Sequence, residues 1–376
     1  MLALPRGRRC RHWLLALATG TFALVVLAAS APAAQDLAAA SCNLETPERI
    51  VAVADVHGAY DRFVAILRAA GLIDGREHWS GGRTIFVQTG DVLDRGPDSR
   101  RAMDLLRRME GEASRAGGRV HALLGNHEVM RMLGDLRYVS SREYAAFRSV
   151  ESEELRERYY LAGMKEAATR ANGAKQKFDE PAFRTAFLDR TPFGWVEMQV
   201  AFGPKGEYGR WLRERDTMVT INGIVFLHGG ISPAVAALGC AKINDTVRSE
   251  LGALPASLDA QQAATLLATR EDGPLWYRGL ALQNESAFAS EVETILLKLG
   301  ARAIVNGHTV TSNGRLATRF GGRVIELDTG MLGGTFFPAG RASALEIRDG
   351  RFTAIYEDKR EVLNVLDGLN RAPVAK

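Results

Sequence analysis

The chain has 376 residues, 46% of them hydrophobic, so it can bury a large core as one big domain or two smaller ones. Its formal net charge of +4 comes from the first 33 residues, which contain four arginines and no acidic residue. The remainder holds 44 basic and 44 acidic residues and is formally neutral. This balance gives no indication of a general nucleic-acid-binding surface, and no nucleic-acid partner is expected.

Residues 1–33 are typical of a secretory signal peptide. A positively charged start is followed by the almost entirely apolar run Trp13–Ala29 and by small residues, Ala31-Pro32-Ala33, at a cleavage position. We therefore expect a periplasmic or secreted protein that meets the membrane only through its export signal. An uncleaved membrane anchor is the alternative, because the apolar run is near the lower length limit for a spanning helix.

Three cysteines are present, and Cys10 would leave with the signal peptide. Cys42 and Cys240 could pair in an oxidising compartment, or both could be unpaired. Residues 34–46 are rich in alanine, and we expect them to form a flexible lead-in to a domain that covers residues 47–358.

The first part of that domain alternates strands with helices. Apolar runs predict strands over Arg49–Ala54, Thr84–Val87 and Val120–Leu124. Amphipathic patterns predict helices over 60–70 and 97–116, the second opened by a proline. Repeated strand–loop–helix units indicate an α/β domain with buried strands.

The rest of the chain is less regular. Residues 140–215 are rich in charge and helix formers and predict a helical insertion or cap. Strands are expected over Val219–Leu227, Ala303–Val305, 323–327, 344–347 and 352–356, and helices over 257–269 and 285–299. The tail, residues 359–376, is charged and contains a short apolar pattern of helical type at Val362, Leu363, Val365 and Leu366.

Polar residues gather where the predicted strands end. Four of the seven histidines lie beside a glycine or in a glycine-bounded turn after a strand, and ligands bind at the carboxyl ends of strands in sheets of this kind. Carboxylates, imidazoles and an amide oxygen suit first-row divalent metals. The proposed ligands are Asp55, His57, Asp91, Asn126, His228 and His308.

Asp91 has enough oxygens to bridge two metal ions. Two ions about 3.5–4 Å apart would acidify a water between them to hydroxide and clamp a phosphate for in-line displacement. A single structural zinc is the alternative, but such a site requires a closed set of four ligands, often including cysteine, and these strand-end segments contain no cysteine.

Two groups remain after the metal ligands are assigned. His127 follows Asn126 directly and should point toward the leaving group as a general acid, with Asp94 placed to orient its ring. Arg95 offers a planar donor fork for phosphate oxygens. An ion pair between Arg95 and Asp94 or Asp98 is the alternative reading of that arginine.

Together these residues resemble the ordered motifs of the phosphoprotein phosphatase branch of the calcineurin-like metallophosphoesterases, and the resemblance spans about residues 49–356. The segments that carry it are Asp55-Val56-His57-Gly58, Gly90-Asp91-Val92-Leu93-Asp94-Arg95-Gly96, Gly125-Asn126-His127-Glu128, His228-Gly229-Gly230 and Gly307-His308. Gly209-Arg210-Trp211-Leu212, Gly223–Leu227 and Pro274-Leu275-Trp276-Tyr277-Arg278 resemble the bacterial Shewanella-like protein phosphatases in particular.

The resemblance implies a central β-sandwich flanked by helices in four α/β/β/α layers, and two metal ions such as manganese, iron or zinc. It also implies hydrolysis of phosphomonoesters, either phosphoproteins carrying phosphoserine, phosphothreonine or phosphotyrosine, or small phosphoesters. Asn126, Arg95 and Arg278 would contact the phosphate; Arg278 is chosen because related eukaryotic enzymes place a second arginine upstream of the last histidine ligand. The eukaryotic tail motif is replaced here by Asp328-Thr329-Gly330-Met331.

Two other functions are compatible with these motifs. A diadenosine-tetraphosphate-type hydrolase has similar motifs, but its third commonly ends in Asp where this chain has Glu128. A metal-holding protein without catalysis would have no use for the Asp94–His127 pair. The sequence predicts no oligomeric state.

Overall fold

The computed structural model describes residues 42–254 and 260–365. The strands are β1 (Asn43–Leu44), β2 (Ile50–Val53), β3 (Ile85–Gln88), β4 (Arg119–Ala122), β5 (Met218–Ile221), β6 (Ile224–Leu227), β7 (Ala303–Asn306), β8 (Ala317–Arg319), β9 (Val324–Glu326), β10 (Ser343–Arg348), β11 (Arg351–Tyr356) and β12 (Arg360–Val362). The helices are α2 (Tyr60–Ala69), α3 (Ser99–Arg115), α4 (Asn126–Met132), α5 (Ser141–Ala146), α6 (Ser152–Gly173), α7 (Glu180–Arg190), α8 (Trp195–Phe202), α9 (Glu207–Arg213), α10 (Pro233–Ala236), α11 (Cys240–Gly252), α12 (Ala260–Ala263), α13 (Gly279–Leu282) and α14 (Glu285–Leu299), with a 3-10 turn, η1, at Phe320–Gly322.

The strands form two six-stranded sheets. One has the order β1-β5-β6-β7-β9-β8 and the other β12-β11-β10-β2-β3-β4. Each contains three neighbouring parallel strands, β6-β7-β9 in the first sheet and β2-β3-β4 in the second. The sequence segments that follow these six strands carry almost all of the polar clusters, so both sheets contribute to one region.

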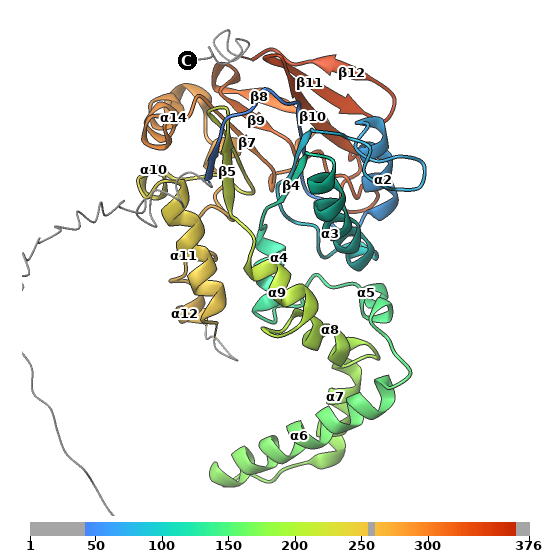
Figure 1. Cartoon of the computed structure of the whole chain (residues 1–376). Helices are drawn as coiled ribbons and strands as arrows, with labels where there is room; N and C mark the ends of the chain where they lie inside the picture. Colours follow the sequence, from blue (N-terminus) through green and yellow to red (C-terminus); the bar gives the residue numbers. More distant parts are fainter. Residues whose placement is uncertain (1–41, 255–259, 366–376) are drawn as a thin grey trace, which may run out of the picture.

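The two sheets pack face to face. Alternate residues of each strand point to opposite faces, so one face of each sheet can pack on the other sheet while the second face packs on helices. In β2, Ile50 and Ala52 belong to a core shared with Phe226 and Val305 of the other sheet. The intervening residues of β2 face the helices instead. Helices α2 and α3 cover one sheet while α11 and α14 cover the other (Figure 1). The expected four-layer α/β/β/α architecture is therefore confirmed.

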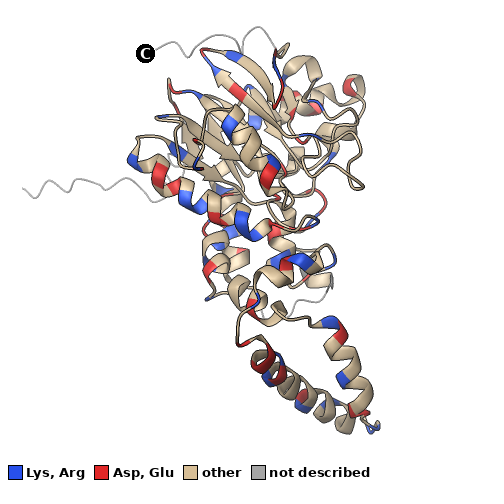
Figure 2. Cartoon of the chain, turned by 90° about the vertical axis from the view of Figure 1, so that its right-hand side faces the viewer, with Lys and Arg blue, Asp and Glu red and all other residues tan. Residues whose placement is uncertain are grey.

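The segment expected to be a helical insertion contains α5 to α9. Helices α6 and α7 form an arm that extends away from the sheets (Figure 1) and pack on each other through Tyr160, Phe183 and Phe187. Helices α8 and α9 connect the arm to the body. Acidic and basic residues are interspersed over both arm and body (Figure 2). Within residues 42–254 and 260–365, no helix combines the length and apolarity needed to cross a membrane.

The single strand expected over Val219–Leu227 is wrong. The structure has a tight antiparallel hairpin, in which Ile221 pairs with Ile224 across Asn222 and Gly223. Both turn residues have positive φ, 52° and 72°, as a type I′ turn requires. Asn-Gly is the residue pair that favours this turn, so the hairpin has a signal in the sequence.

The chain ends are more ordered than expected. Within the predicted flexible lead-in, β1 pairs in parallel with β5, and a disulfide joins Cys42 to Cys240, 198 residues away. Within the predicted tail, β12 is an edge strand on β11, with Arg360 opposite Ile355, so the helical pattern expected there is wrong as far as Val365. The predicted signal peptide, residues 34–41 of the lead-in and the rest of the tail lie outside the described residues.

The helix expected over 257–269 is also shorter in the structure. Its described part is helical only in α12 and continues as turns. The carboxylate of Glu250 accepts hydrogen bonds from the backbone N–H groups of Leu267 and Ala268, at 2.8 and 3.0 Å. Because those donors are used by a side chain of α11, they do not continue a helix.

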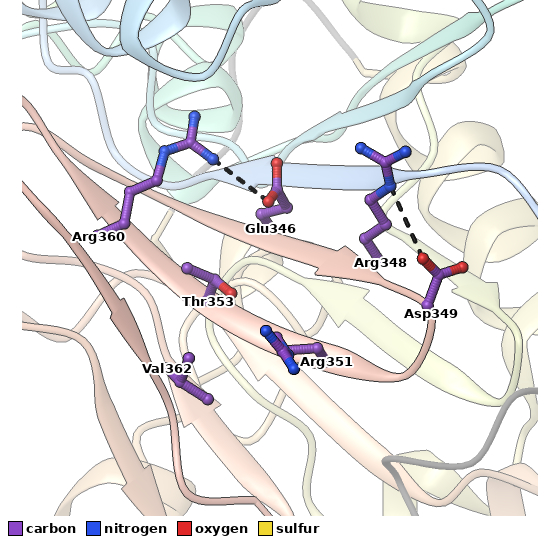
Figure 3. A pocket seen from close by; sticks show the side chains of 7 residues that line it. All are labelled: Glu346, Arg348, Asp349, Arg351, Thr353, Arg360 and Val362. Atoms are coloured by element: carbon purple, nitrogen blue, oxygen red, sulfur yellow. Dashed lines mark hydrogen bonds and ion pairs between the residues drawn. The ribbon is translucent and has the colours of Figure 1, made fainter.

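A hollow lies on the outer face of β10, β11 and β12 (Figure 3). Its lining residues are Glu346, Arg348, Asp349, Arg351, Thr353, Arg360 and Val362. Arg360 pairs with Glu346 at 3.3 Å and Arg348 with Asp349 at 3.8 Å, so acidic neighbours balance part of its positive charge. None of these residues belongs to the histidine-bearing segments.

Candidate active site

The six predicted metal ligands converge at the carboxyl ends of the parallel strands. Asp55 and His57 follow β2, Asp91 follows β3, Asn126 begins α4 after β4, and His228 and His308 follow β6 and β7. All six are at most 7% exposed. Residues separated by up to 253 positions in the chain are thus brought into one buried cluster, and the backbone N–H of His308 donates to Asp55 Oδ1 at 3.0 Å.

Backbone contacts hold the motif loops together. The N–H groups of Val56 and His57 donate to the carbonyl of Asp91 at 2.9 and 3.0 Å. Gly90 has φ of 98°, and a Cβ there would lie 2.4 Å from the backbone nitrogen of Gly125, so only glycine fits this approach. The loops after β3 and β4 can therefore touch directly.

Several site residues adopt left-handed backbone conformations. They are His57 (φ 48°), Asp91 (φ 56°), Asp94 (φ 70°), Arg95 (φ 65°) and His308 (φ 67°). Such conformations are uncommon for residues other than glycine and cost energy, and they concentrate at functional sites. Here they turn successive side chains of short loops toward the same buried region.

One group of potential ligand atoms surrounds His57 and Asp91. His57 Nε2 is 3.7 Å from both Asp55 Oδ2 and Asp91 Oδ2, while His127 Nε2 is 3.8 Å from Asp91 Oδ2. The other ring nitrogen of His57 lies 2.8 Å from the Leu93 carbonyl, which fixes it as the N–H donor and leaves Nε2 as an electron-pair donor. This geometry suits a divalent cation.

A second group surrounds His228. Its Nδ1 lies 3.0 Å from the carbonyl of Thr89, so Nε2 faces the site as an electron-pair donor. That Nε2 is 3.3 Å from Asp91 Oδ2, 2.9 Å from Asn126 Oδ1 and 3.1 Å from His308 Nδ1. Asp91 thus belongs to both groups, which is the arrangement required of a bridging ligand.

The donor set fits metal ions for a further reason. Asp55 Oδ2 is buried and has no hydrogen-bond partner among the described protein groups. The same is true of Asp328 Oδ2, from the loop after β9. Buried electron-pair donors that lack hydrogen bonds are costly, and a cation would compensate for them.

Burial and the neighbouring charges set the protonation of the cluster. Burial lowers the pKa of His57 to about 3 and that of His308 to about 2. Burial, with the charges of Asp328 and Asp91, raises the pKa of Asp55. Burial opposes ionisation of Asp91 too, but His228 and His127 outweigh it and the pKa of Asp91 is lowered. Neutral imidazoles beside an ionised carboxylate are the ligand forms that metals bind.

The predicted general acid and its partner lie at the edge of this cluster. His127 Nδ1 is 2.7 Å from Asp94 Oδ2, and both side chains are at most 2% exposed. Burial alone would lower the pKa of His127, but the charge of Asp91 and the hydrogen bond to Asp94 outweigh it, so the pKa is raised. A protonated imidazole beside the cluster is suited to donate a proton to a leaving group.

The two predicted phosphate-binding arginines lie next to the ligand cluster. The guanidinium of Arg95 lies between the rings of Tyr138 and Phe337, 5.6 and 5.5 Å from their centroids, and contacts His57 Nε2. Among the described residues it forms no ion pair with Asp94 or Asp98, the alternative considered for it. Arg278 Nη1 donates to the carbonyl of His308 at 3.0 Å, so it reaches the same region.

Sequence reasoning missed Glu128, although it belongs to the third motif. Its fully buried carboxylate accepts backbone hydrogen bonds from Asp91 (2.8 Å), Val92 (2.9 Å), Leu93 (3.2 Å) and Gly125 (2.8 Å). One carboxylate therefore joins the loops that follow β3 and β4. An acidic residue in the first turn of a helix, next to two glycine-bounded loops, could have suggested this role.

Other site residues had no local signature in the sequence. Tyr138 is 42% exposed, and its ring centroid is 5.1 Å from that of His127. Arg131 and Glu143 extend the Asp94–His127 pair into the protein interior. Burial and the charge of Asp91 raise the pKa of Asp328 to about 6, and the charge of Asp328 in turn helps to raise the pKa of Asp55. Each of these residues is brought in by tertiary packing.

Comparison with known proteins agrees with this geometry. Residues 48–312 match the family described as calcineurin-like phosphoesterase. The chain is 28% identical over 312 residues to Shewanella-like protein phosphatase 2 of Arabidopsis thaliana, covering 81% of this chain and 76% of that protein. It is 26% identical over 318 residues to Shewanella-like protein phosphatase 1 of Plasmodium berghei, covering 83% and 75%. The solved structure of a cold-active protein-tyrosine phosphatase from a psychrophilic Shewanella species superposes with a TM-score of 0.63 at 26% identity, covering 86% of this chain and 82% of that one.

Proposed function

From the premise that this chain belongs to the calcineurin-like phosphoesterase family, we propose that it is a dinuclear metal-dependent phosphatase that hydrolyses phosphomonoesters. The observation that carries the proposal is the convergence of six buried metal-ligand side chains beside the buried His127–Asp94 pair. Two divalent ions, of manganese, iron or zinc, would supply Lewis acidity and an activated water for attack on phosphorus. They would be held by Asp55, His57, Asp91, Asn126, His228 and His308.

The chain's own residues would place the phosphate and handle the proton. Arg95 contacts His57 and Arg278 contacts the carbonyl of His308, so both guanidinium groups lie beside the cluster, where they can bind phosphate oxygens. The Asn126 side chain adds an amide group beside them. His127 would protonate the departing ester oxygen, while Asp94 keeps its ring in place and stabilises the charged form.

Phosphoproteins are the proposed substrates, with small phosphoesters as further candidates. The aromatic rings of Tyr138 and Phe337 flank Arg95 at the rim and could pack against an aryl leaving group, which supports phosphotyrosine alongside phosphoserine and phosphothreonine. The similar Shewanella protein is described as a protein-tyrosine phosphatase. Phosphopeptide panels would establish the preference, and diadenosine tetraphosphate serves as the competing substrate.

The decisive experiment combines metal removal with a change of the general acid. Chelation should abolish turnover of p-nitrophenyl phosphate and of phosphopeptides, and elemental analysis should find two ions per chain. His127→Asn should keep both ions yet lower turnover of a phosphoserine peptide about 10²–10⁴-fold, with a smaller loss on p-nitrophenyl phosphate, whose leaving group needs no proton. Activity that survives chelation, or cleavage of diadenosine tetraphosphate alone, would overturn the proposal.

We further propose that the protein is exported. The disulfide between Cys42 and Cys240 supports this, since such bonds persist mainly in oxidising compartments. Sequencing the N-terminus of protein recovered from the periplasm of an expressing bacterium should find residues 1–33 removed. A membrane-bound product with an intact N-terminus would favour the uncleaved anchor.

A further inference from the structure

Arg131 is a buried cation behind the catalytic pair. It lies in α4, one turn after His127, and its side chain is only 1% exposed. Its Nη2 contacts Asp94 Oδ1 and also donates to Glu143 Oε2 at 2.7 Å. Asp94 therefore uses one carboxylate oxygen for His127 and the other for Arg131.

The remaining partners of Arg131 belong to the helical insertion. Glu143 lies in α5, while Met198 and Phe202 lie in α8. Arg131 Nη1 is 3.2 Å from Met198 Sδ, and the guanidinium lies 4.9 Å from the centroid of the Phe202 ring. Residues of the insertion thus contact a side chain that also contacts Asp94.

Such a buried ionic group is not explained by stability. Removing an arginine and two carboxylates from water is costly, and buried ion pairs are often no more stabilising than apolar side chains of similar size. The ionic group does restrict the orientation of the Asp94 carboxylate, because a carboxylate held at both oxygens cannot rotate. A fixed orientation of Asp94 fixes in turn the direction in which the ring of His127 points.

We propose that Arg131 and Glu143 are positioning residues for proton transfer: Arg131 holds the Asp94 carboxylate in the plane that orients His127, and Glu143 of the insertion holds Arg131. This inference rests on the proposed role of His127 as general acid. The insertion would then take part in catalysis through Glu143. Neither residue touches the substrate.

The test compares leaving groups, because a positioning role affects only esters that require protonation. Arg131→Met keeps the side chain's apolar length but removes the contact to Asp94. Turnover of phenyl phosphate and of a phosphoserine peptide should fall about 10–100-fold, part of what a general acid supplies, while turnover of p-nitrophenyl phosphate falls much less. KM and metal content should stay near their original values. Glu143→Gln, which keeps an acceptor for Arg131, should change the ratio of the two turnovers in the same direction but less.

A double variant separates action through Asp94 from a general loosening of the fold. Adding Arg131→Met to Asp94→Asn should cause little further loss, because the two residues act on the same group. Arg100→Met is the matched control. Arg100 also holds the insertion, donating to the carbonyl of Ala146 at 2.6 Å and lying 4.8 Å from the Phe147 ring, but it does not contact Asp94. Its removal should leave the dependence on the leaving group unchanged.

Each outcome decides one claim. Equal losses on both kinds of ester in Arg131→Met, or additive losses in the double variant, would overturn the positioning role. If Arg131→Met does not fold, Glu143→Gln decides alone, and an unchanged ratio overturns the inference. If His127→Asn itself shows no dependence on the leaving group, it is the general-acid proposal that fails. The last case is a ratio of turnover on phenyl phosphate to turnover on p-nitrophenyl phosphate that changes in His127→Asn but not in Arg131→Met. That result overturns only the further inference.

Discussion

Replacing Glu128 by glutamine should destabilise the protein strongly although the two side chains have the same shape. The carboxylate accepts four backbone hydrogen bonds, with Asp91 and Gly125 at one oxygen and Val92 and Leu93 at the other. A glutamine has only one oxygen, so in either orientation of its amide two backbone N–H groups would face another donor.

The cost follows from those two donors. Each buried N–H group that loses its acceptor costs about 1–3 kcal/mol, so Glu128→Gln should lower the free energy of unfolding by about 2–6 kcal/mol. That is a large part of the roughly 5–15 kcal/mol by which typical domains are stable. Because Asp91 is one of the anchored residues, the affinity for metal should fall as well.

Urea unfolding followed by tryptophan fluorescence measures the effect, with a chelator present so that metal binding does not contribute. Glu112→Gln is the matched control. The side chain of Glu112 is 15% exposed, and its carboxylate accepts a hydrogen bond from only one backbone group, Trp79 N–H at 2.7 Å, and pairs with the ring of His78. It should lose about 1 kcal/mol or less. A loss below about 1 kcal/mol in Glu128→Gln would refute the four-bond argument.

Three further predictions concern other parts of the chain. Arg278→Ala should raise KM for phosphomonoesters and Ki for inorganic phosphate about 10–100-fold, the worth of one charge-assisted contact, with metal content unchanged; unaltered phosphate binding would exclude Arg278 from the site. Burial raises the pKa of Glu326 to about 7, only partly offset by Arg319. The Glu326 carboxyl therefore stays protonated in the folded protein at pH values above its ordinary pKa of 4.5. Its contribution to the free energy of unfolding is present in acid and is lost as pH rises through about 7. Unfolding curves at pH 5.5 and 8.5 should differ by about 2 kcal/mol because of this group, and Glu326→Gln should remove that difference. Stability profiles against pH that run parallel in the original protein and the variant would contradict the prediction. Replacing Cys42 and Cys240 by serine should lower the free energy of unfolding by about 2–5 kcal/mol under oxidising conditions, with no difference expected once a reductant is added.

The sequence predicts this fold best where local chemistry and strand ends coincide. Asp55, Asp91 and His308 were identified because buried strands stop just before them and glycines allow sharp turns there. The position of these residues at strand ends depends only on a few neighbouring residues, so it can be predicted without knowledge of the tertiary structure. The Asn222-Gly223 turn is an equally local signal, but it stands between two short apolar segments that together have the length of one long strand.

The remaining features depend on contacts between distant segments. Strand β1 is two residues long and exists because β5 offers an edge and a disulfide holds its start. Nothing in the neighbourhood of Arg131 predicts that its charge is buried, because its partners come from α5, α8 and the loop after β3. Tyr138 likewise becomes part of the site only when the chain after α4 folds back over His127.

The left-handed backbone at the motif loops has an evolutionary consequence. At Arg95, whose φ is 65°, glycine would relieve about 1–2 kcal/mol of local strain. A laboratory selection for thermal stability alone should therefore enrich glycine at this position and yield variants that are more stable but less active. Selection for turnover, which would depend on the proposed contact of Arg95 with phosphate, should instead retain the arginine.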